Sequence, residues 1–265
     1  MAEIWGHRGA YDFAPENTLE SFSLAADMGA DGVELDIQLT KDGKVVVIHD
    51  ETVERVSDGH GYVKDLTLSE LKRLNFNKRG LTLPYFMEIP TLAEVFELLS
   101  ATGLQINIEL KTGIVYYEGI EQKALALAGQ HGMSDRIVWS SFNHWSVQNV
   151  KRIEPSAKTA LLCGGGILAT GEECERTGAE ALHPDVRQFR FPGLVEDCHR
   201  RGVKVRPFTV NSPEDLRAAY EIGVDGVFTN NIIFAKAERR AHGEAPLSVA
   251  AAGTGSPSDS HPPIR

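Results

Sequence analysis

The segment DMGADGVELDI (residues 27–37) joins a helical pattern to an apolar run through a glycine. Gly29 follows the last residue with helical periodicity, and Val33–Ile37 alternates apolar and acidic residues. A glycine just past a helix end takes the left-handed conformation at little cost, so this joint predicts a helix C-cap that leads into a strand. EIGVDGVFTN (residues 221–230) repeats nearly the same joint. The chain therefore uses one helix-to-strand unit at least twice.

Similar joints elsewhere in the chain, together with two further apolar runs, predict eight strands. They are expected at Glu3–His7, Val33–Ile37, Gln105–Leu110, Arg136–Ser141, Lys158–Leu162, Glu180–His183, Val203–Thr209 and Asp225–Thr229. Helical patterns lie between most of them, such as those at Thr18–Met28, Thr91–Ser100, Gly119–Gln130, Gly193–Arg201 and Pro213–Ile222. Strands that alternate with helices form right-handed βαβ units and a parallel sheet. Eight such units predict an α/β fold of the (β/α)8 TIM-barrel type. A nine-stranded open sheet is the alternative, because Lys44–His49 is also strand-like.

Two segments fall outside the repeating units. The polar turn at Lys41–Gly43 predicts a hairpin that rises above the second barrel strand. Residues from about 51 to 90 lack a clear βα unit, so we expect a small insertion over the barrel mouth, where active sites of this fold lie. From about Ala241 the chain is rich in Ala, Gly, Ser and Pro without apolar periodicity. We therefore expect a barrel domain over residues 1–240 and a disordered tail over residues 241–265.

The composition restricts the classes of partner. The formal net charge is −10, which repels nucleic acid and acidic membrane surfaces. No apolar run approaches the ~18–20 residues of a membrane span, and the first residues lack the basic region of a signal peptide. Cys163, Cys174 and Cys198 show no metal-ligand spacing and indicate reduced thiols. We expect a cytoplasmic protein with no nucleic-acid partner and no stable membrane insertion, while the oligomeric state is not predicted.

Three acidic residues lie on predicted barrel strands. Glu34 and Asp36 alternate along one strand, so both point to the same face. A solvated face of a half-exposed strand is one interpretation. Glu109, near the end of the next barrel strand, favours another, because a buried charge is costly unless it is paired or bound to a metal. Three carboxylates at one barrel mouth specify one hard divalent cation, Mg²⁺ or Ca²⁺.

Histidines and cations end predicted strands at the same face. His7 and His49 each end an apolar run and have the positions expected of a general acid and a general base. Arg8 and Lys111 supply the local positive charge that a phosphate group needs in an acidic protein. The structural alternatives are an ion pair of Arg8 with Glu16 and an exposed position for Lys111 at the rim.

Taken in order, the motifs GHRG, PENTLESF, GADGVELDIQLTKDGKVVVIHD, INIELK, SSFNHWSV, PFTVNS and GVDGVFTN resemble the glycerophosphodiester phosphodiesterase family over roughly residues 3–235. The resemblance implies a barrel with an insertion after its second strand. It also implies the roles of the site residues. These are a metal held by Glu34, Asp36 and Glu109, an acid–base pair of His7 and His49, and phosphate binding by Arg8 and Lys111.

Two positions depart from the family pattern. Phe208 stands where the family often has Trp, and it is expected to keep an apolar wall against the substrate. Asn230 stands where the family often has Asp, which puts a carboxylate contact at that position in doubt.

Several neighbouring residues have structural or open interpretations. Asn17 and Glu20 have the spacing of an N-cap and its reciprocal partner. Glu16 either supports Arg8 or contacts the metal region. The glycine-rich segment at Leu161–Ile167 lacks the Lys-Ser/Thr of a phosphate loop and is expected to be a loop at the barrel mouth. Aromatic rings expected in the core or along the pocket are those of Phe142, Trp145 and His183.

The sequence thus predicts a metal-dependent phosphodiesterase that cleaves a glycerophosphodiester to sn-glycerol 3-phosphate and an alcohol by histidine acid–base catalysis. One alternative is a phospholipase-type phosphodiesterase that acts on intact lipid and carries an exposed apolar rim. Another is a non-catalytic binding protein on the same barrel. The partner expected in the first case is a small glycerophosphodiester.

Overall fold

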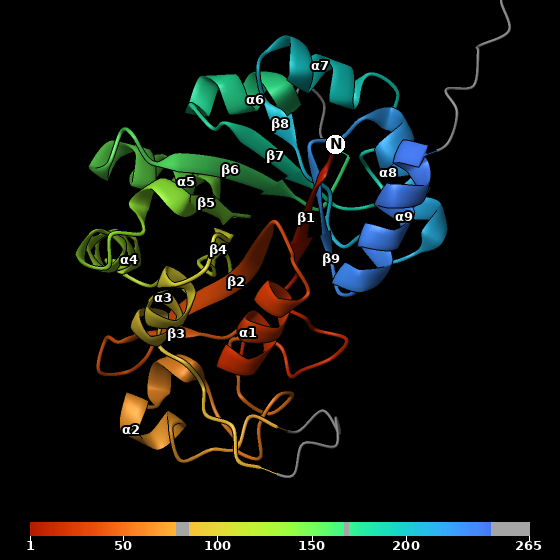
Figure 1. Ribbon diagram of the computed structural model, residues 1–265. Coiled ribbons are helices and arrows are strands. Elements are labelled where there is room, and N and C mark those ends of the chain that lie inside the picture. Colours follow the sequence, from red (N-terminus) through yellow and green to blue (C-terminus); the bar gives the residue numbers. More distant parts are fainter. Residues whose placement is uncertain (78–84, 167–169, 245–265) are drawn as a thin grey trace, which may run out of the picture.

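A computed structural model describes residues 1–77, 85–166 and 170–244 of the chain. In these residues eight parallel strands surround a central axis, and helices lie outside them (Figure 1). The parallel strands are β1 (Glu3–Gly6), β2 (Gly32–Leu39), β4 (Gln105–Leu110), β5 (Ile137–Ser141), β6 (Lys158–Cys163), β7 (Ala181–Pro184), β8 (Lys204–Val205) and β9 (Gly226–Thr229). The strand order is β8-β7-β6-β5-β4-β2-β1-β9, as the alternation of strands and helices predicts.

The ring of strands is nearly closed between β8 and β9. The predicted strand Val203–Thr209 is regular only at Lys204–Val205. Backbone hydrogen bonds nevertheless join the two ends: the Asp225 N–H donates to the Val205 carbonyl at 2.9 Å and the Phe228 N–H to the Pro207 carbonyl at 3.0 Å. The prediction of a TIM barrel is therefore confirmed, and the open-sheet alternative is wrong.

The two similar glycine joints flank β1 in the barrel. Gly29 and Gly223 have φ of 68° and 82°, the left-handed conformation expected of a helix C-cap. A Cβ on Gly32, the second glycine of the first joint, would lie 2.5 Å from the Trp5 ring. The aspartate of the second joint, Asp225, accepts a hydrogen bond from the Val205 N–H at 2.7 Å. The repeated sequence thus caps a helix, leaves room for a large ring inside the barrel and ties neighbouring strands together.

The ninth strand-like segment lies off the barrel path. β3 (Val45–Val47) pairs antiparallel with the end of β2, with Ile37 opposite Val47 and Leu39 opposite Val45. The hairpin prediction is therefore confirmed. It brings His49 back towards the carboxyl end of β2, where the Ile48 N–H donates to the Asp36 carbonyl at 2.9 Å.

The helices cover the outside of the strands (Figure 1). They are α1 (Leu19–Asp27), α3 (Leu92–Ser100), α4 (Ile120–Gln130), α5 (His144–Ile153), α6 (Thr170–Thr177), α7 (Leu194–Arg200), α8 (Pro213–Ile222) and α9 (Ile232–Glu244). The helical ranges expected from the sequence did not include α5, α6 or α9, although the glycine joint at Gly178, whose φ is 71°, indicated the helix end that α6 has at Thr177. Short helical turns form α2 (Leu68–Leu71), η1 (Val63–Asp65) and η2 (Ser134–Arg136).

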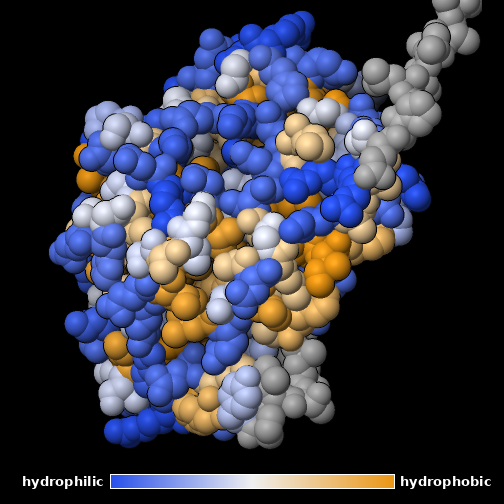
Figure 2. Space-filling view, in the orientation of Figure 1, coloured by the Kyte–Doolittle hydropathy of each residue, from blue (hydrophilic) through white to orange (hydrophobic). Residues whose placement is uncertain are grey.

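Each barrel strand has two different faces. Residues such as Val33, Leu35 and Ile37 pack outward against the helices in the main hydrophobic core. The inward face carries a small apolar cluster around Trp5 and Phe228, with the acidic residues of β2 and β4 above it. No helix in the described part of the chain is long and apolar enough to cross a membrane. Hydrophilic residues predominate on the face in Figure 2, and apolar residues form patches between them.

The insertion packs as a small lobe with its own core. Val53, Val63, Leu71 and Ile89 lie buried in one cluster with Val46 and Ile48 of the β3 hairpin. In Figure 1 this lobe, which contains α2, lies beside α1 and α3. Residues 78–84 of the predicted insertion lie outside the described residues. The expected tail begins inside α9, which continues to Glu244, and its remaining residues 245–265 also lie outside the described residues.

Candidate active site

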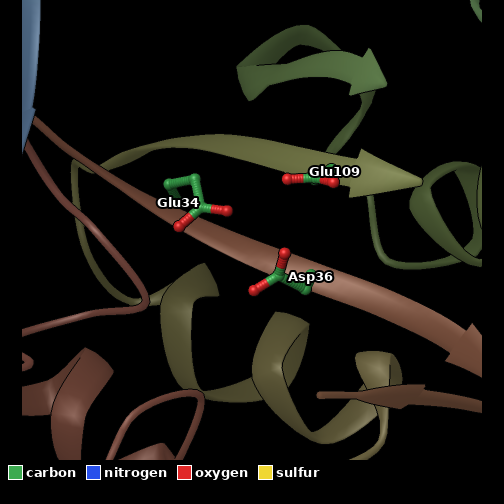
Figure 3. A group of neighbouring side chains, drawn as sticks. All are labelled: Glu34, Asp36 and Glu109. Carbon is green, nitrogen blue, oxygen red and sulfur yellow. The ribbon is translucent and has the colours of Figure 1, made fainter. Parts of the chain in front are cut away.

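Three carboxylates meet inside the barrel near the carboxyl ends of two neighbouring strands. β2 carries Glu34 and Asp36, and β4 carries Glu109 directly opposite Asp36 in the strand register. Figure 3 shows their side chains directed into the same space between the strands. One oxygen or more from each residue lies within 4.8 Å of the others, and all three residues are buried. The predicted cluster is therefore assembled by strand alternation and register alone.

Burial and mutual repulsion divide the three carboxylates into two kinds. Burial and the neighbouring Asp36 charge raise the pKa of Glu109 to about 7 and the pKa of Glu34 well above its usual value. Burial also opposes the charge of Asp36, but His49, Arg8 and Lys111 outweigh it and hold the pKa of Asp36 well below its usual value. The cluster thus carries more negative potential than the surrounding cations neutralise.

The donor set fits a hard divalent cation. Oδ1 of Asp36 is buried without a hydrogen-bond partner, which is costly in the absence of a compensating group. Carboxylate oxygens are the ligands preferred by Mg²⁺ and Ca²⁺, and a cation would remove the repulsion that raises two of the three pKa values. The geometry therefore suits a metal ion at Glu34, Asp36 and Glu109.

Two cationic side chains border the carboxylates. Arg8 adopts φ of 54°, and its backbone N–H donates to Glu34 Oε2 at 2.8 Å. Its Nη1 donates to Glu16 Oε1 at 2.8 Å, so the predicted ion pair is present and Glu16 supports Arg8. The Lys111 Nζ lies 2.9 Å from Glu109 Oε1. Its side chain is only 12% exposed, so the alternative of an exposed rim residue is wrong.

His7 extends from the end of β1 into a desolvated position. Its Nδ1–H donates to Asn230 Oδ1 at 2.8 Å, which leaves Nε2 with its lone pair. Burial and the positive charge of Arg8 lower the pKa of His7 from 6.5 to about 4. At this position, where the sequence put a carboxylate contact in doubt, the contact is made by the amide oxygen of Asn230. It adds no negative charge beside the imidazole.

His49 has a different partner. Its Nδ1–H donates to Asp50 Oδ1 at 2.6 Å. Although burial opposes the charge of Asp50, hydrogen bonds from Arg55 and His49 lower the pKa of Asp50 to about 2. The His49 Nδ1–H therefore contacts an ionised carboxylate. The two histidines therefore differ in the charge of the group that holds Nδ1.

The sequence interpretation missed Arg55, which the insertion contributes. Its guanidinium donates to both oxygens of Glu16 at 2.6 and 2.8 Å and to both oxygens of Asp50 at 2.5 and 3.0 Å. Glu16 also binds Arg8, and Asp50 also binds His49, so Arg55 connects the two groups. No local pattern in the sequence indicates this contact, because Glu16 and Arg55 are separated by 39 positions.

Asn17 has a role other than the predicted one. The N-cap of α1 is Thr18, whose extended backbone and reciprocal contacts with Ser21 form the capping box. Asn17 takes φ of 56° instead, which an N-cap does not adopt. Its Nδ2 donates to Asp36 Oδ2 at 2.9 Å. The N-cap prediction is therefore wrong by one residue, and Asn17 orients the central carboxylate.

These groups share a pocket of about 200 Å³. Its lining residues are His7, Arg8, Glu34, His49, Asn107, Glu109, Phe142, Leu162, Phe208, Thr209 and Phe228. Lys111 and Asp36 lie behind this surface, in contact with Glu109 and Arg8. Phe208 meets Phe142 edge to face, with ring centroids 5.7 Å apart. The predicted site residues are thus brought together, and Phe208 forms an apolar wall.

Two of the aromatic rings considered from the sequence lie elsewhere. Trp145 lies in the first turn of α5 and is 78% exposed, so it is neither core nor part of the pocket lining. His183 is fully buried inside the barrel, where its ring contacts Phe228 at 4.8 Å between centroids. Of the glycine-rich segment Leu161–Ile167, Leu162 lines the pocket and Ile167 lies outside the described residues.

Comparisons with known proteins agree on one family. The model of the glycerophosphoryl diester phosphodiesterase family matches residues 7–233. A glycerophosphodiester phosphodiesterase of Caldanaerobacter subterraneus subsp. tengcongensis is 44% identical over 231 residues, which cover 86% of this chain and 93% of that protein. A solved phosphodiesterase of Oleispira antarctica, in complex with the product sn-glycerol-3-phosphate, has a TM-score of 0.83 and 31% identity and covers 91% of this chain and 97% of its own. The glycerophosphodiester phosphodiesterase of Thermotoga maritima has a TM-score of 0.74 and 31% identity, with coverages of 89% and 98%.

Proposed function

The chain belongs to the glycerophosphoryl diester phosphodiesterase family, and from this premise we propose that it hydrolyses glycerophosphodiesters to sn-glycerol 3-phosphate and an alcohol. The observation that carries the proposal is the composition of the pocket. Of three carboxylates suited to one divalent cation, Mg²⁺ or Ca²⁺, Glu34 and Glu109 border the same 200 Å³ space as two histidines and Arg8, and the third lies behind them. The product complex of the Oleispira antarctica relative supports the substrate class.

The phosphodiester group binds beside Arg8 and Lys111. Glu16 holds the guanidinium of Arg8 in place, and Glu109 holds the Lys111 ammonium. A guanidinium presents two N–H groups to phosphate oxygens, whereas an ammonium acts as a point charge. When bound at Glu34, Asp36 and Glu109, the divalent cation supplies further stabilisation of charge that develops on the phosphoryl oxygens. Phe208 packs against the apolar part of the substrate.

His7 acts as the general base and His49 as the general acid. The low pKa of His7 keeps its Nε2 unprotonated at neutral pH, and the amide of Asn230 fixes this tautomer. It accepts the proton of the attacking hydroxyl, which belongs to water or to the glycerol of the substrate itself. His49, whose Nδ1–H is held by the Asp50 carboxylate, donates a proton to the leaving alkoxide. With water as the nucleophile, His7 then loses its proton to solvent and His49 regains one from solvent. With the substrate hydroxyl as the nucleophile, a cyclic phosphate forms first, and in the second step His49 takes a proton from water while His7 returns one to the ring oxygen that leaves.

The test is release of sn-glycerol 3-phosphate from glycerophosphocholine and glycerophosphoethanolamine by purified protein. We expect activity that disappears with chelator, returns with Mg²⁺ or Ca²⁺, and falls at least about 100-fold in His7→Ala and His49→Ala, the usual scale of general acid–base catalysis. His60→Ala is the matched control, because His60 is an exposed histidine that lies outside the pocket lining. Full activity of either pocket variant would remove that histidine from the mechanism. Inactivity of the wild type on both diesters with both metals would refute the proposed function.

A further inference from the structure

Gln38 is the next residue of β2 to share a face with Glu34 and Asp36. Side chains alternate along a strand, so these three residues point to the same side of β2. Gln38 is fully buried and pairs with Val46 of β3. Its amide therefore lies where the barrel meets the β3 hairpin, the segment that brings His49 back to the carboxyl end of β2.

The amide nitrogen of Gln38 holds the backbone around His49. Its Nε2 donates to the carbonyl oxygens of Ile48, His49 and Asp50 at 3.1, 3.0 and 2.7 Å. The two amide hydrogens are thus shared among three successive carbonyls. Among the residues that the structure describes, no other group donates to these three oxygens. The carbonyl hydrogen bonds of this segment therefore depend on one side chain.

Tyr117 fixes the direction of the Gln38 amide. Its hydroxyl donates to Gln38 Oε1 at 2.7 Å from the segment between β4 and α4, and the residue is buried. A flipped amide would place Oε1 against three carbonyl oxygens, which have no hydrogen to donate, and would turn Nε2 towards the hydroxyl. The hydroxyl and the carbonyls therefore select the same amide orientation. A side chain that follows β4 thus contributes to the position of His49.

The two ends of His49 have different supports. Asp50 binds Nδ1 of the ring and sets the direction of the imidazole, whereas Gln38 binds the backbone from which the ring extends. A general acid must lie within hydrogen-bond reach of the leaving oxygen, and a displacement of about 1 Å can cost about 100-fold in rate. We propose that Gln38 and Tyr117 are a positioning pair for His49, which hold its imidazole within reach of the leaving oxygen. The inference rests on the proposed function, because it assigns both residues to the general acid of that reaction.

Two substrates that differ only in the leaving group test the proposal. Glycerophosphocholine loses an alkoxide, which needs a proton from His49, whereas the p-nitrophenyl diester of sn-glycerol 3-phosphate loses p-nitrophenolate, which leaves without one at pH 8. Gln38→Met keeps the length of the side chain and removes its donor. We expect it to lower kcat for glycerophosphocholine about 10- to 100-fold and to leave kcat for the p-nitrophenyl diester within about twofold. KM should stay within about twofold for both, because the proposed phosphate ligands Arg8 and Lys111 are unchanged.

Tyr117→Phe tests the second member of the pair. It removes one buried hydroxyl, so we expect kcat for glycerophosphocholine to fall about 2- to 10-fold with the same dependence on the leaving group. Tyr220→Phe is the matched control, because the Tyr220 hydroxyl is also buried and donates to the Ala235 carbonyl at 3.0 Å, outside the pocket lining. The control should hydrolyse both diesters at wild-type rates. Since Tyr117→Phe deletes a single oxygen atom, it keeps the test decisive even if Gln38→Met does not fold.

A double-mutant cycle separates positioning from general support of the fold. In His49→Ala there is no acid to position, so adding Gln38→Met should lower glycerophosphocholine hydrolysis no further. An equal loss in the two backgrounds would overturn the inference, as would an equal loss on the two diesters or wild-type rates in both Gln38→Met and Tyr117→Phe. In each of these cases the proposed function stands, because the wild type is active. Inactivity of the wild type on both diesters would instead refute the proposed function and the inference with it.

Discussion

Replacing Asn230 by Asp isolates the role of His7. In the wild type the His7 Nδ1–H donates to a neutral amide oxygen at 2.8 Å, and burial together with Arg8 lowers the pKa of His7 to about 4. Asn230→Asp places a carboxylate of nearly the same shape at the same contact. An opposite charge within ~4–6 Å raises a histidine pKa by about 1–3 units, which moves the pKa of His7 to about 5–7.

The sign of the effect follows from the proposed role of His7 as the general base. Only the neutral imidazole accepts a proton, so kcat/KM falls as pH drops below the pKa of His7. At pH 5.5 a group of pKa about 4 is roughly 97% neutral, whereas a group of pKa about 6 is roughly 25% neutral. We therefore expect the variant to retain about a quarter of its plateau kcat/KM at pH 5.5, where the wild type retains nearly all.

The assay is a pH profile of kcat/KM for glycerophosphocholine from pH 4 to pH 9 at saturating metal. Asn211→Asp is the matched control, since Asn211 Oδ1 accepts from the Asn230 backbone N–H and does not contact the imidazole. It adds the same charge with a smaller expected displacement of the acid limb. An acid limb that Asn230→Asp leaves in place would show that His7 is not the group that controls it, and the assignment of the base would pass to His49.

Three further predictions concern one proposed metal ligand and two residues that hold other side chains of the site in place. In metal-free protein the raised pKa of Glu109 makes the free energy of unfolding fall as pH rises from about 4.5 to about 7, so at pH 8 Glu109→Gln should melt above the wild type. Added Mg²⁺ or Ca²⁺ should reverse that order in differential scanning fluorimetry, and equal melting temperatures without metal would contradict the argument. Arg55→Leu should lower kcat/KM roughly 5- to 30-fold, which corresponds to about 1–2 kcal/mol after allowance for the exposure of this side chain. Arg55→Lys should restore only part of this activity, because one ammonium group cannot donate to both oxygens of both carboxylates. Asn17→Ala should raise the half-saturating metal concentration for activity about 10-fold, because Asp36 loses the hydrogen bond that orients it. An unchanged half-saturating concentration would exclude this role.

The barrel was predictable from sequence because its signals are local. A glycine that ends a helix and an apolar run that follows it lie within a few residues of each other, as at Gly29 and Gly223. The predictions failed where pairing depends on distant chain. Most of Val203–Thr209 is apolar enough to resemble a strand, but only Lys204–Val205 pairs regularly, because the rest bends to meet β7 and β9.

The carboxylates were predictable for a related reason. Alternation places Glu34 and Asp36 on one face of β2, and parallel register places Glu109 beside them, so two local patterns and one topological rule define the cluster. Arg55, Asn17 and Asn230 follow no such rule. Their contacts join side chains 19 to 223 positions apart, through loops whose paths the sequence patterns do not specify.

Those unpredicted residues are the ones that make the two histidines unequal. Both histidines end strands and appear equivalent in the sequence, where either suits the acid or the base. In the fold, Asn230 in the loop after β9 presents a neutral amide to His7, whereas His49 contacts the carboxylate of Asp50, which Arg55 from the insertion holds. A neutral partner leaves an imidazole free to accept a proton, and an anionic partner stabilises an imidazolium that can donate one. The insertion therefore does more than border the pocket. With one guanidinium it holds both Asp50 and Glu16, and so it fixes the carboxylate beside His49, the proposed acid, and the position of Arg8, the proposed phosphate ligand.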